Sequence, residues 1–439
     1  MEGDGSMRPQ LILVALCLAA GAAHAQQPDT TTQPLQVTLA DAVQRALQVQ
    51  PSMILAEGSV RSANAQRLAS NGAFLPALSA GAGSTRSGGT QTIPGGGLAP
   101  FPARTNFGLT LAASWDLFTG FRRLASRSAA GAAQDAADAG LVNQRYAVTL
   151  LVKQAFYNAI ADEELVHVAE AQLARTRQEL QTSLDKLRVG SATRSDSLRS
   201  AVDVGNARIA LLQAQSNLAF AQATLGRQIG VDRPVRAIPD SIIPPVPDTT
   251  GLRAATIGAA PQVRQADALA RAARSQVWIS RSSYWPTFNT SLSKGYSGSQ
   301  APWTAGSAFP DNWSVRFSLN WTLFNGFVRE QGVTNAGVNR DVAEAEAADT
   351  RRAVNASLTQ AMSGLETAFT QLDIAQANLA AATEDMRVQQ ERYRVGASTI
   401  LDLLTSQAAL TTAGVNVVQT RFNYLISRAT LEALVGHAL

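Results

Sequence analysis

The chain has 439 residues, of which 46% are hydrophobic, 16% charged and 6% aromatic, and its formal net charge is +4. A soluble globular chain carries about a quarter charged residues, so charge is scarce here, and the hydrophobic content excludes a disordered protein. One cysteine excludes a disulfide scaffold, and arginines scattered without a basic stripe argue against a nucleic-acid partner.

The N-terminal segment has the pattern of an export signal. Arg8 precedes an apolar run from Leu11 to Ala20, and the sequence Ala-His-Ala follows at residues 23–25. A run of about ten apolar residues is too short to span a bilayer but suits a cleaved signal peptide. We therefore expect residues 1–25 to be removed, and Cys17 with them.

The rest of the chain contains an internal sequence repeat. WDLFTGFRR at residues 115–123 returns 206 residues later as WTLFNGFVR at 321–329, and other matches share that offset. An internal repeat of this kind is one structural unit used twice. The sequence thus predicts a single protomer over 26–439, with repeats at about 36–230 and 250–439 joined by a Pro-rich connector at 234–248.

Each repeat opens with an Ala-rich helical pattern and then alternates strictly between apolar and polar residues, which predicts β-hairpins near 76–118 and 286–324. Alternation over about eleven residues fits a transmembrane strand, and we expect Trp115, Trp313 and Trp321 to be membrane-interface aromatics. A soluble hairpin would alternate too, but no further strands are predicted for it to pack on. The Gly-rich stretch at 81–97 is expected to be an external loop.

A sheet that spans lipid cannot leave its edges open, so it must close into a barrel. Four strands are too few, because barrels need at least about eight. The sequence therefore predicts closure between subunits.

Long helices follow each hairpin, over 122–188 and 328–394. At about 1.5 Å per residue each would extend roughly 100 Å, which no globular domain requires. Their narrow seams indicate side-by-side coiled-coil packing. The seam positions in the first repeat are Val166, Ala169, Leu173, Thr176, Leu180, Ser183 and Leu187.

Hairpin tips are predicted at about 188–196 and 394–402. Gly190 and Gly396 end the long helices, and Thr193 or Ser195 and Ser398 or Thr399 cap the returning helices.

These motifs, in this order and duplicated, resemble the TolC-like outer-membrane efflux family over residues 36–439. The resemblance implies an α+β membrane protein: a homotrimer whose twelve strands form one barrel in the outer membrane of a Gram-negative bacterium, continued by an α-helical coiled-coil barrel in the periplasm. It implies an exit duct for small-molecule efflux or type I secretion that works passively. The implied partners are a periplasmic adaptor, an inner-membrane transporter and outer-membrane lipid.

The resemblance also assigns residues. Val189, Gly190, Val395 and Gly396 look like the family's adaptor-contact tips. Asp196, Asp402 and Tyr393 correspond to a gate at the periplasmic end, with the Tyr393 hydroxyl reaching an aspartate such as Asp196. Three copies of each aspartate would form an acidic ring that favours cations. Alternatively, both aspartates only cap the returning helices. Two positions, Ser398 and Thr405, depart from the family pattern.

Two other classes of protein were weighed. A periplasmic coiled-coil adaptor without a barrel would explain the signal and the long helices, but not the two tryptophan-flanked hairpins. An enzyme is not expected, because no catalytic residue, cofactor-binding residue or metal ligand is recognised. The histidines left after signal removal, His167 and His437, show no metal spacing.

Overall fold

The computed structural model describes residues 34–239, 244–247, 252–301, 304, 310–437 and 439. The predicted signal peptide, residues 1–25, lies outside this range, as do parts of the Pro-rich connector.

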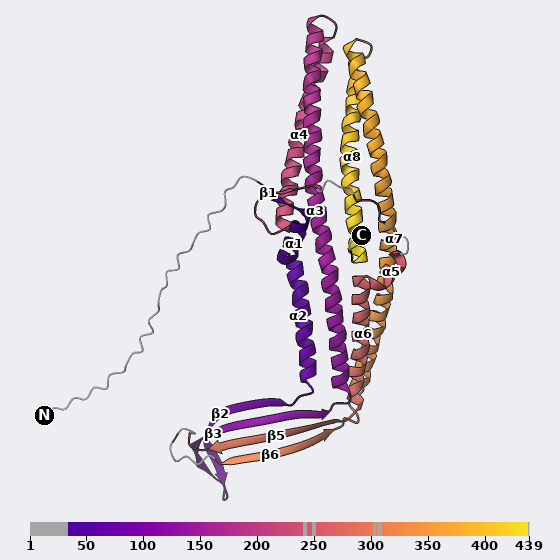
Figure 1. The fold of residues 1–439 in the computed structure, drawn as a ribbon. Helices are drawn as coiled ribbons and strands as arrows, with labels where there is room; N and C mark the ends of the chain where they lie inside the picture. Colours follow the sequence, from indigo (N-terminus) through magenta and orange to yellow (C-terminus); the bar gives the residue numbers. More distant parts are fainter. Residues whose placement is uncertain (1–33, 240–243, 248–251, 302–303, 305–309, 438) are drawn as a thin grey trace, which may run out of the picture. The chain divides into compact units, whose positions relative to one another are not determined.

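The same order of elements occurs twice along the chain (Figure 1). Each repeat has a helical segment, a β-hairpin, a helix of 67 residues and a returning helix. The first repeat contains β1 (Leu35–Val37), α1 (Leu39–Val49), α2 (Pro51–Gly72), β2 (Ala77–Ile93), β3 (Gly97–Phe118), α3 (Arg122–Arg188), α4 (Arg194–Gln228) and β4 (Val235–Ala237). The second contains α5 (Leu252–Ala259), α6 (Pro261–Arg281), the short 3-10 turn η1 (Ser282–Tyr284), β5 (Thr287–Gly298), β6 (Asp311–Asn320), α7 (Val328–Arg394) and α8 (Ile400–Val435).

The two hairpins join into one antiparallel sheet of four strands, in the order β2-β3-β5-β6. The junction is the β3–β5 pair, in which Phe107 lies opposite Gly298 and Trp115 opposite Thr290. β2 and β6 are therefore the edge strands. A second, parallel pair joins β1 and β4, with Val37 opposite Ala237.

The first hairpin lies within the predicted residues 76–118, but its strands are longer than expected, and the expected loop over 81–97 is wrong. β2 and β3 pair from Ala77 opposite Ser114 as far as Ile93 opposite Gly97. Glycine is depleted in strands, which hid them, but pairing between the two strands satisfies their backbone groups regardless of side chains. β3 reaches β5 only from Phe107 onward, so residues 97–106 form a two-stranded ribbon with β2.

The last strand of the second hairpin is shorter than the sequence indicated. β6 ends at Asn320, although the alternation continues to Leu323. Trp321 consequently lies just after the strand, where its indole contacts a backbone carbonyl described below.

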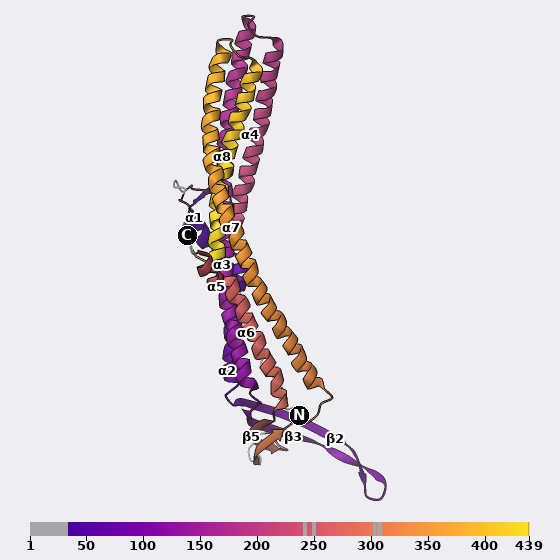
Figure 2. The ribbon, with the colours of Figure 1, turned by 90° about the vertical axis from the view of Figure 1, so that its right-hand side faces the viewer.

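The helices pack mainly in antiparallel neighbours, α3 with α4 and α6, and α7 with α8 and α6 (Figures 1 and 2). The largest buried apolar cluster lies where α1, α3, α4 and α8 meet the β1–β4 pair. Many residues buried along the long helices are alanine, serine or threonine. Small side chains let helix backbones approach closely, which explains how narrow seams hold helices of this length together.

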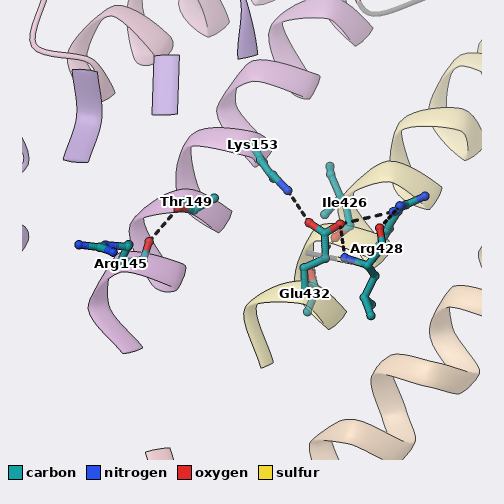
Figure 3. Close-up of polar contacts among 8 residues, drawn as sticks. Arg145, Thr149, Lys153, Ile426, Arg428 and Glu432 are labelled. Carbon is teal, nitrogen blue, oxygen red and sulfur yellow. Dashed lines mark hydrogen bonds and ion pairs between the residues drawn. The ribbon is translucent and has the colours of Figure 1, made fainter. Parts of the chain in front are cut away.

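An ion pair between α3 and α8 ties the first repeat to the second (Figure 3). Lys153 donates to Glu432, and both side chains are largely buried. Arg428 lies one turn from Glu432 on α8, with its Nε 3.4 Å from the same carboxylate. Removing one partner of such a pair would leave a buried charge without compensation, which is strongly destabilising.

Both junctions between hairpin and long helix turn through a left-handed glycine, and only one of the two is crowded. Gly120 has φ 61° and Gly326 has φ 66°. A Cβ atom on Gly120 would lie 2.6 Å from the Ser282 carbonyl oxygen and 2.8 Å from the Trp285 Cβ, whereas one on Gly326 would meet nothing within 4 Å. The repeats thus share a turn but differ in its surroundings.

We predict that Gly120→Ala destabilises the protein more than Gly326→Ala. Both substitutions place an L side chain at positive φ, at a cost of about 1 kcal/mol, but only the first also forces backbone apart at the β3–η1 contact. Denaturation midpoints of the two variants in detergent test this. Equal losses would show that the contact of Gly120 with Ser282 contributes nothing.

Candidate functional site

The helical tips are closed by the same hydrogen bonds in both repeats. At the first tip, Gly190 has φ 75° and the Ser191 amide donates to the Lys186 carbonyl over 2.9 Å. At the second, Gly396 has φ 81° and the Ala397 amide donates to the Arg392 carbonyl over 2.7 Å. This six-to-one bond around a left-handed residue is the Schellman ending of a helix, and glycine adopts that conformation without strain.

The four residues assigned to adaptor contact lie on open surface. Val189 is 77% exposed and Val395 66% exposed. A Cβ atom built on Gly190 or Gly396 would meet nothing within 4 Å. We call these four residues the tip surface. Exposed apolar side chains beside bare backbone suit a partner that approaches closely.

Asp196 and Asp402 both form capping boxes. The Asp196 carboxylate accepts from the Thr193 amide at 2.9 Å and from its hydroxyl at 2.8 Å, and the Asp402 carboxylate accepts from Thr399 at 3.0 and 2.8 Å. These hydrogen bonds lower the pKa of each carboxyl below its ordinary value. Both aspartates are thus ionised members of capping boxes. They help to cap the returning helices, as the alternative to a gate had it. A role in a gate stays a prediction.

The Tyr393 side chain lies where the two helical hairpins meet near the tips. Its ring is buried with Met386, Ile400 and Leu403, and its hydroxyl is 3.4 Å from the Ser183 hydroxyl. The Asp196 carboxylate accepts hydrogen bonds from Thr193, and a bond from Tyr393 to an aspartate stays a prediction.

Lys186 completes the contact between the two tips. It donates to the Tyr393 carbonyl, its ammonium lies 3.8 Å from the Tyr393 ring centroid, and burial lowers its pKa. Tyr393 therefore joins the first helical hairpin (α3–α4) to the second (α7–α8).

At the opposite ends of the long helices, two of the predicted interface aromatics make matching bonds. The Trp115 indole donates to the Phe74 carbonyl at 3.0 Å, and the Trp321 indole donates to the Tyr284 carbonyl at 3.2 Å. Trp313 is exposed on β6. Each bond ties the end of a hairpin to the helical segment that precedes it.

The same motif contributes two arginines to which the sequence analysis gave no role. The Arg123 guanidinium lies 5.0 Å from the Phe74 ring centroid, and the Arg329 guanidinium lies 4.2 Å from the Tyr284 ring centroid. Arg123 also donates to the Leu117 carbonyl and Arg329 to the Thr322 carbonyl. Both arginines end the repeated motif, 206 residues apart, so the sequence could have indicated that they share a role.

The sheet has one apolar and one polar face. The register places on one face Leu78, Phe107, Leu109, Leu111, Trp115, Phe288, Leu292, Trp313, Val315, Phe317 and Leu319. Many of these are exposed, and Lys294 pairs with Asp311 at 3.4 Å on the same face. The other face carries Ser79, Thr110, Ser114, Asn289, Ser291, Ser293, Ser314, Arg316 and Ser318. An apolar face of this size left uncovered indicates a lipid or protein contact.

In the part of the chain that the structure describes, none of the helices is long and apolar enough to span a membrane. Within the same residues, no group of three or more histidines, cysteines or acidic residues is placed to hold a metal ion.

Comparison with known proteins agrees with the geometry. The family model described as "Outer membrane efflux protein" matches residues 42–231 and 253–437. Protein CyaE of Bordetella pertussis is 25% identical over 379 residues, covering 85% of this chain and 78% of that protein. The probable efflux pump outer membrane protein TtgC of Pseudomonas putida is 23% identical over 306 residues, covering 66% of this chain and 60% of that protein.

Solved structures share the fold. The Campylobacter jejuni CmeC outer membrane channel superposes with a TM-score of 0.78 at 17% identity, covering 91% of this chain and 85% of that one. The outer membrane protein VceC of Vibrio cholerae gives a TM-score of 0.77 at 18% identity, covering 91% and 96%. Since the family model matches most of its length, the chain belongs to the outer membrane efflux protein family.

Proposed function

We propose that the protein is the outer-membrane exit duct of a tripartite efflux or type I secretion system, and that it forms a homotrimer. The observation that carries this proposal is the sheet, with an uncovered apolar face, a polar face and two unpaired edge strands. Lipid suits the apolar face, and water in a lumen suits the polar one.

The edges give the reason for assembly. β2 and β6 each expose backbone groups that no strand among the described residues pairs, and in lipid each unpaired group costs several kcal/mol. Pairing β6 of one chain with β2 of the next closes the sheet. Three chains would supply twelve strands, enough for a barrel with an aqueous channel.

The helices would continue the duct in the periplasm, with the tip surface facing an adaptor and, through it, an inner-membrane transporter. The relatives support this arrangement, since one is named as part of an efflux pump. Cargo would be moved by the transporter, and the duct itself would be passive. A periplasmic coiled-coil adaptor is not favoured, because it leaves the apolar face of the sheet without a partner.

We predict that Gly190→Leu or Gly396→Leu abolishes export while the assembled protein still reaches the outer membrane. A bulky side chain would block close approach of the adaptor at the tip surface. Gly190→Ala and Gly396→Ala are the matched controls, because they introduce the same positive-φ strain with little bulk, and they should retain more export. Drug susceptibility and heat-resistant oligomer on gels are the measurements. Full export in the leucine variants would contradict an adaptor contact at the tips.

We also predict that Asp196→Asn combined with Asp402→Asn lowers the cation selectivity of the duct in planar bilayers. Asparagine retains an acceptor oxygen for the Thr193 and Thr399 amides, so the caps survive while the charge is removed. Reversal potentials in asymmetric salt measure the effect. Unchanged selectivity would leave the two aspartates as helix caps alone.

A further inference from the structure

Three acidic or amide side chains lie at one height in the helical bundle, and one oxygen of each is buried without a hydrogen-bond donor. Glu179 on α3 is 7% exposed. Its Oε1, Oδ2 of Asp203 on α4 and Oε1 of Gln389 on α7 are each buried without any hydrogen-bond partner. Buried polar atoms are nearly always paired, so three unpaired acceptors together call for an explanation.

Hydrogen bonds around Ser183 fix the common height of these three side chains. The Ser183 hydroxyl is 3.1 Å from the Ser200 hydroxyl of α4 and 3.4 Å from the Tyr393 hydroxyl of α7. Glu179 and Gln389 lie four residues before Ser183 and Tyr393 on helices that run in the same direction, and Asp203 lies three residues after Ser200. Residues three or four apart share a helix face, so all three face the seam that Ser183 occupies.

Among the described residues, the buried oxygens of Glu179 and Asp203 have no lysine or arginine as a hydrogen-bond partner. Burial, together with the smaller effect of the Asp203 charge, raises the pKa of Glu179 from 4.5 to about 7, and burial also raises the pKa of Asp203. Arg175, one turn away on α3, has its own Nε buried and unpaired. Glu384 and Arg387 of α7 pair with each other at 2.7 Å on the surface.

The neighbouring part of α8 contributes neutral groups. Gln407 is 4% exposed, and both polar atoms of its amide are buried without a partner. The contact of Val168 with Gly414 places this part of α8 beside the same stretch of α3, since the two helices run antiparallel.

We infer that Glu179 and Asp203 form a proton-binding site in the seam between the two helical hairpins, with one hydrogen ion as the ligand. A proton on Glu179 supplies the missing donor, which the Asp203 carboxylate or the Gln389 amide oxygen accepts. Loss of that proton leaves two like charges in a site with little water, which is unfavourable.

The contact between the helical tips should depend on pH, because the pKa of Glu179 is raised. Because the packed seam holds Glu179 protonated at a higher pH than water would, packing is coupled to proton uptake. The contact through Ser183 and Tyr393 is then favoured at low pH and weakens as the pH rises through about 7. For one proton, the ratio of packed to opened seam changes by at most about tenfold per pH unit. The role of this pH dependence in a duct rests on the proposed function, whereas the proton site itself does not.

The site is tested by infrared titration of the full-length protein in detergent. We expect a carboxylic-acid C=O band that disappears with a midpoint near pH 7, is absent in Glu179→Gln, and moves to lower pH in Asp203→Asn. The matched control is Asp385→Asn, the exposed position 206 residues after Glu179, which should leave the band unchanged. A band that persists in Glu179→Gln, or none in the unmodified protein, would overturn the assignment. Loss of the band on adding Mg²⁺ at pH 6 would also overturn it, because a metal ion would then be the ligand.

Tip movement is measured separately, with spin labels at Val189 and Val395. We expect the distance distribution to broaden between pH 6 and pH 8 in the unmodified protein and to stay narrow in Glu179→Gln, whose amide is a permanent donor. Identical broadening in both proteins would contradict coupling of the seam to the proton. Neither measurement depends on transport. A failure of the proton site can therefore be distinguished from a failure of the proposed duct function.

Discussion

The constraint on which the structure depends is that backbone hydrogen bonds cannot be left open in lipid. Each chain offers a sheet of four strands with β2 and β6 at its edges. In the proposed duct the apolar face would contact lipid, and the edge strands would pair with strands of neighbouring chains. Assembly is therefore a condition for the sheet to exist in a membrane.

The junctions between the hairpins and the long helices use the same motif in both repeats. The repeated W-x-L-F-x-G-F-x-R segment connects a strand to a long helix through a left-handed glycine, an indole hydrogen bond and an arginine on an aromatic ring. From there the helices are held by seams of small residues, and at the tips by a few specific polar contacts. Tyr393, Ser183 and Lys186 join the two helical hairpins near the tips.

Much of this was readable from the sequence because it is periodic. The two long helices begin and end at the predicted residues 122–188 and 328–394, since the glycines at both ends mark them. The strand length at 81–97 was not readable, because pairing with a partner strand outweighs the poor strand propensity of glycine. The buried state of Glu179 was hidden for a related reason: a heptad pattern names apolar seam positions, and Glu179 lies beside the predicted seam residue Leu180. Burial of a charge depends on which helices enclose it, which sequence spacing alone does not give.

The closed trimeric barrel is tested most directly by cross-linking the sheet edges of neighbouring chains. In a Cys17→Ser background, cysteine pairs would be placed with one member on β2 and the other on β6. Since β3 and β5 lie between these strands in one chain, about 14 Å separates them, and a disulfide can form only between chains. We predict a ladder of cross-linked species that ends at three chains in the outer membrane. A chain that stays a monomer with every pair, or a ladder that continues past three, would contradict the closed trimeric barrel.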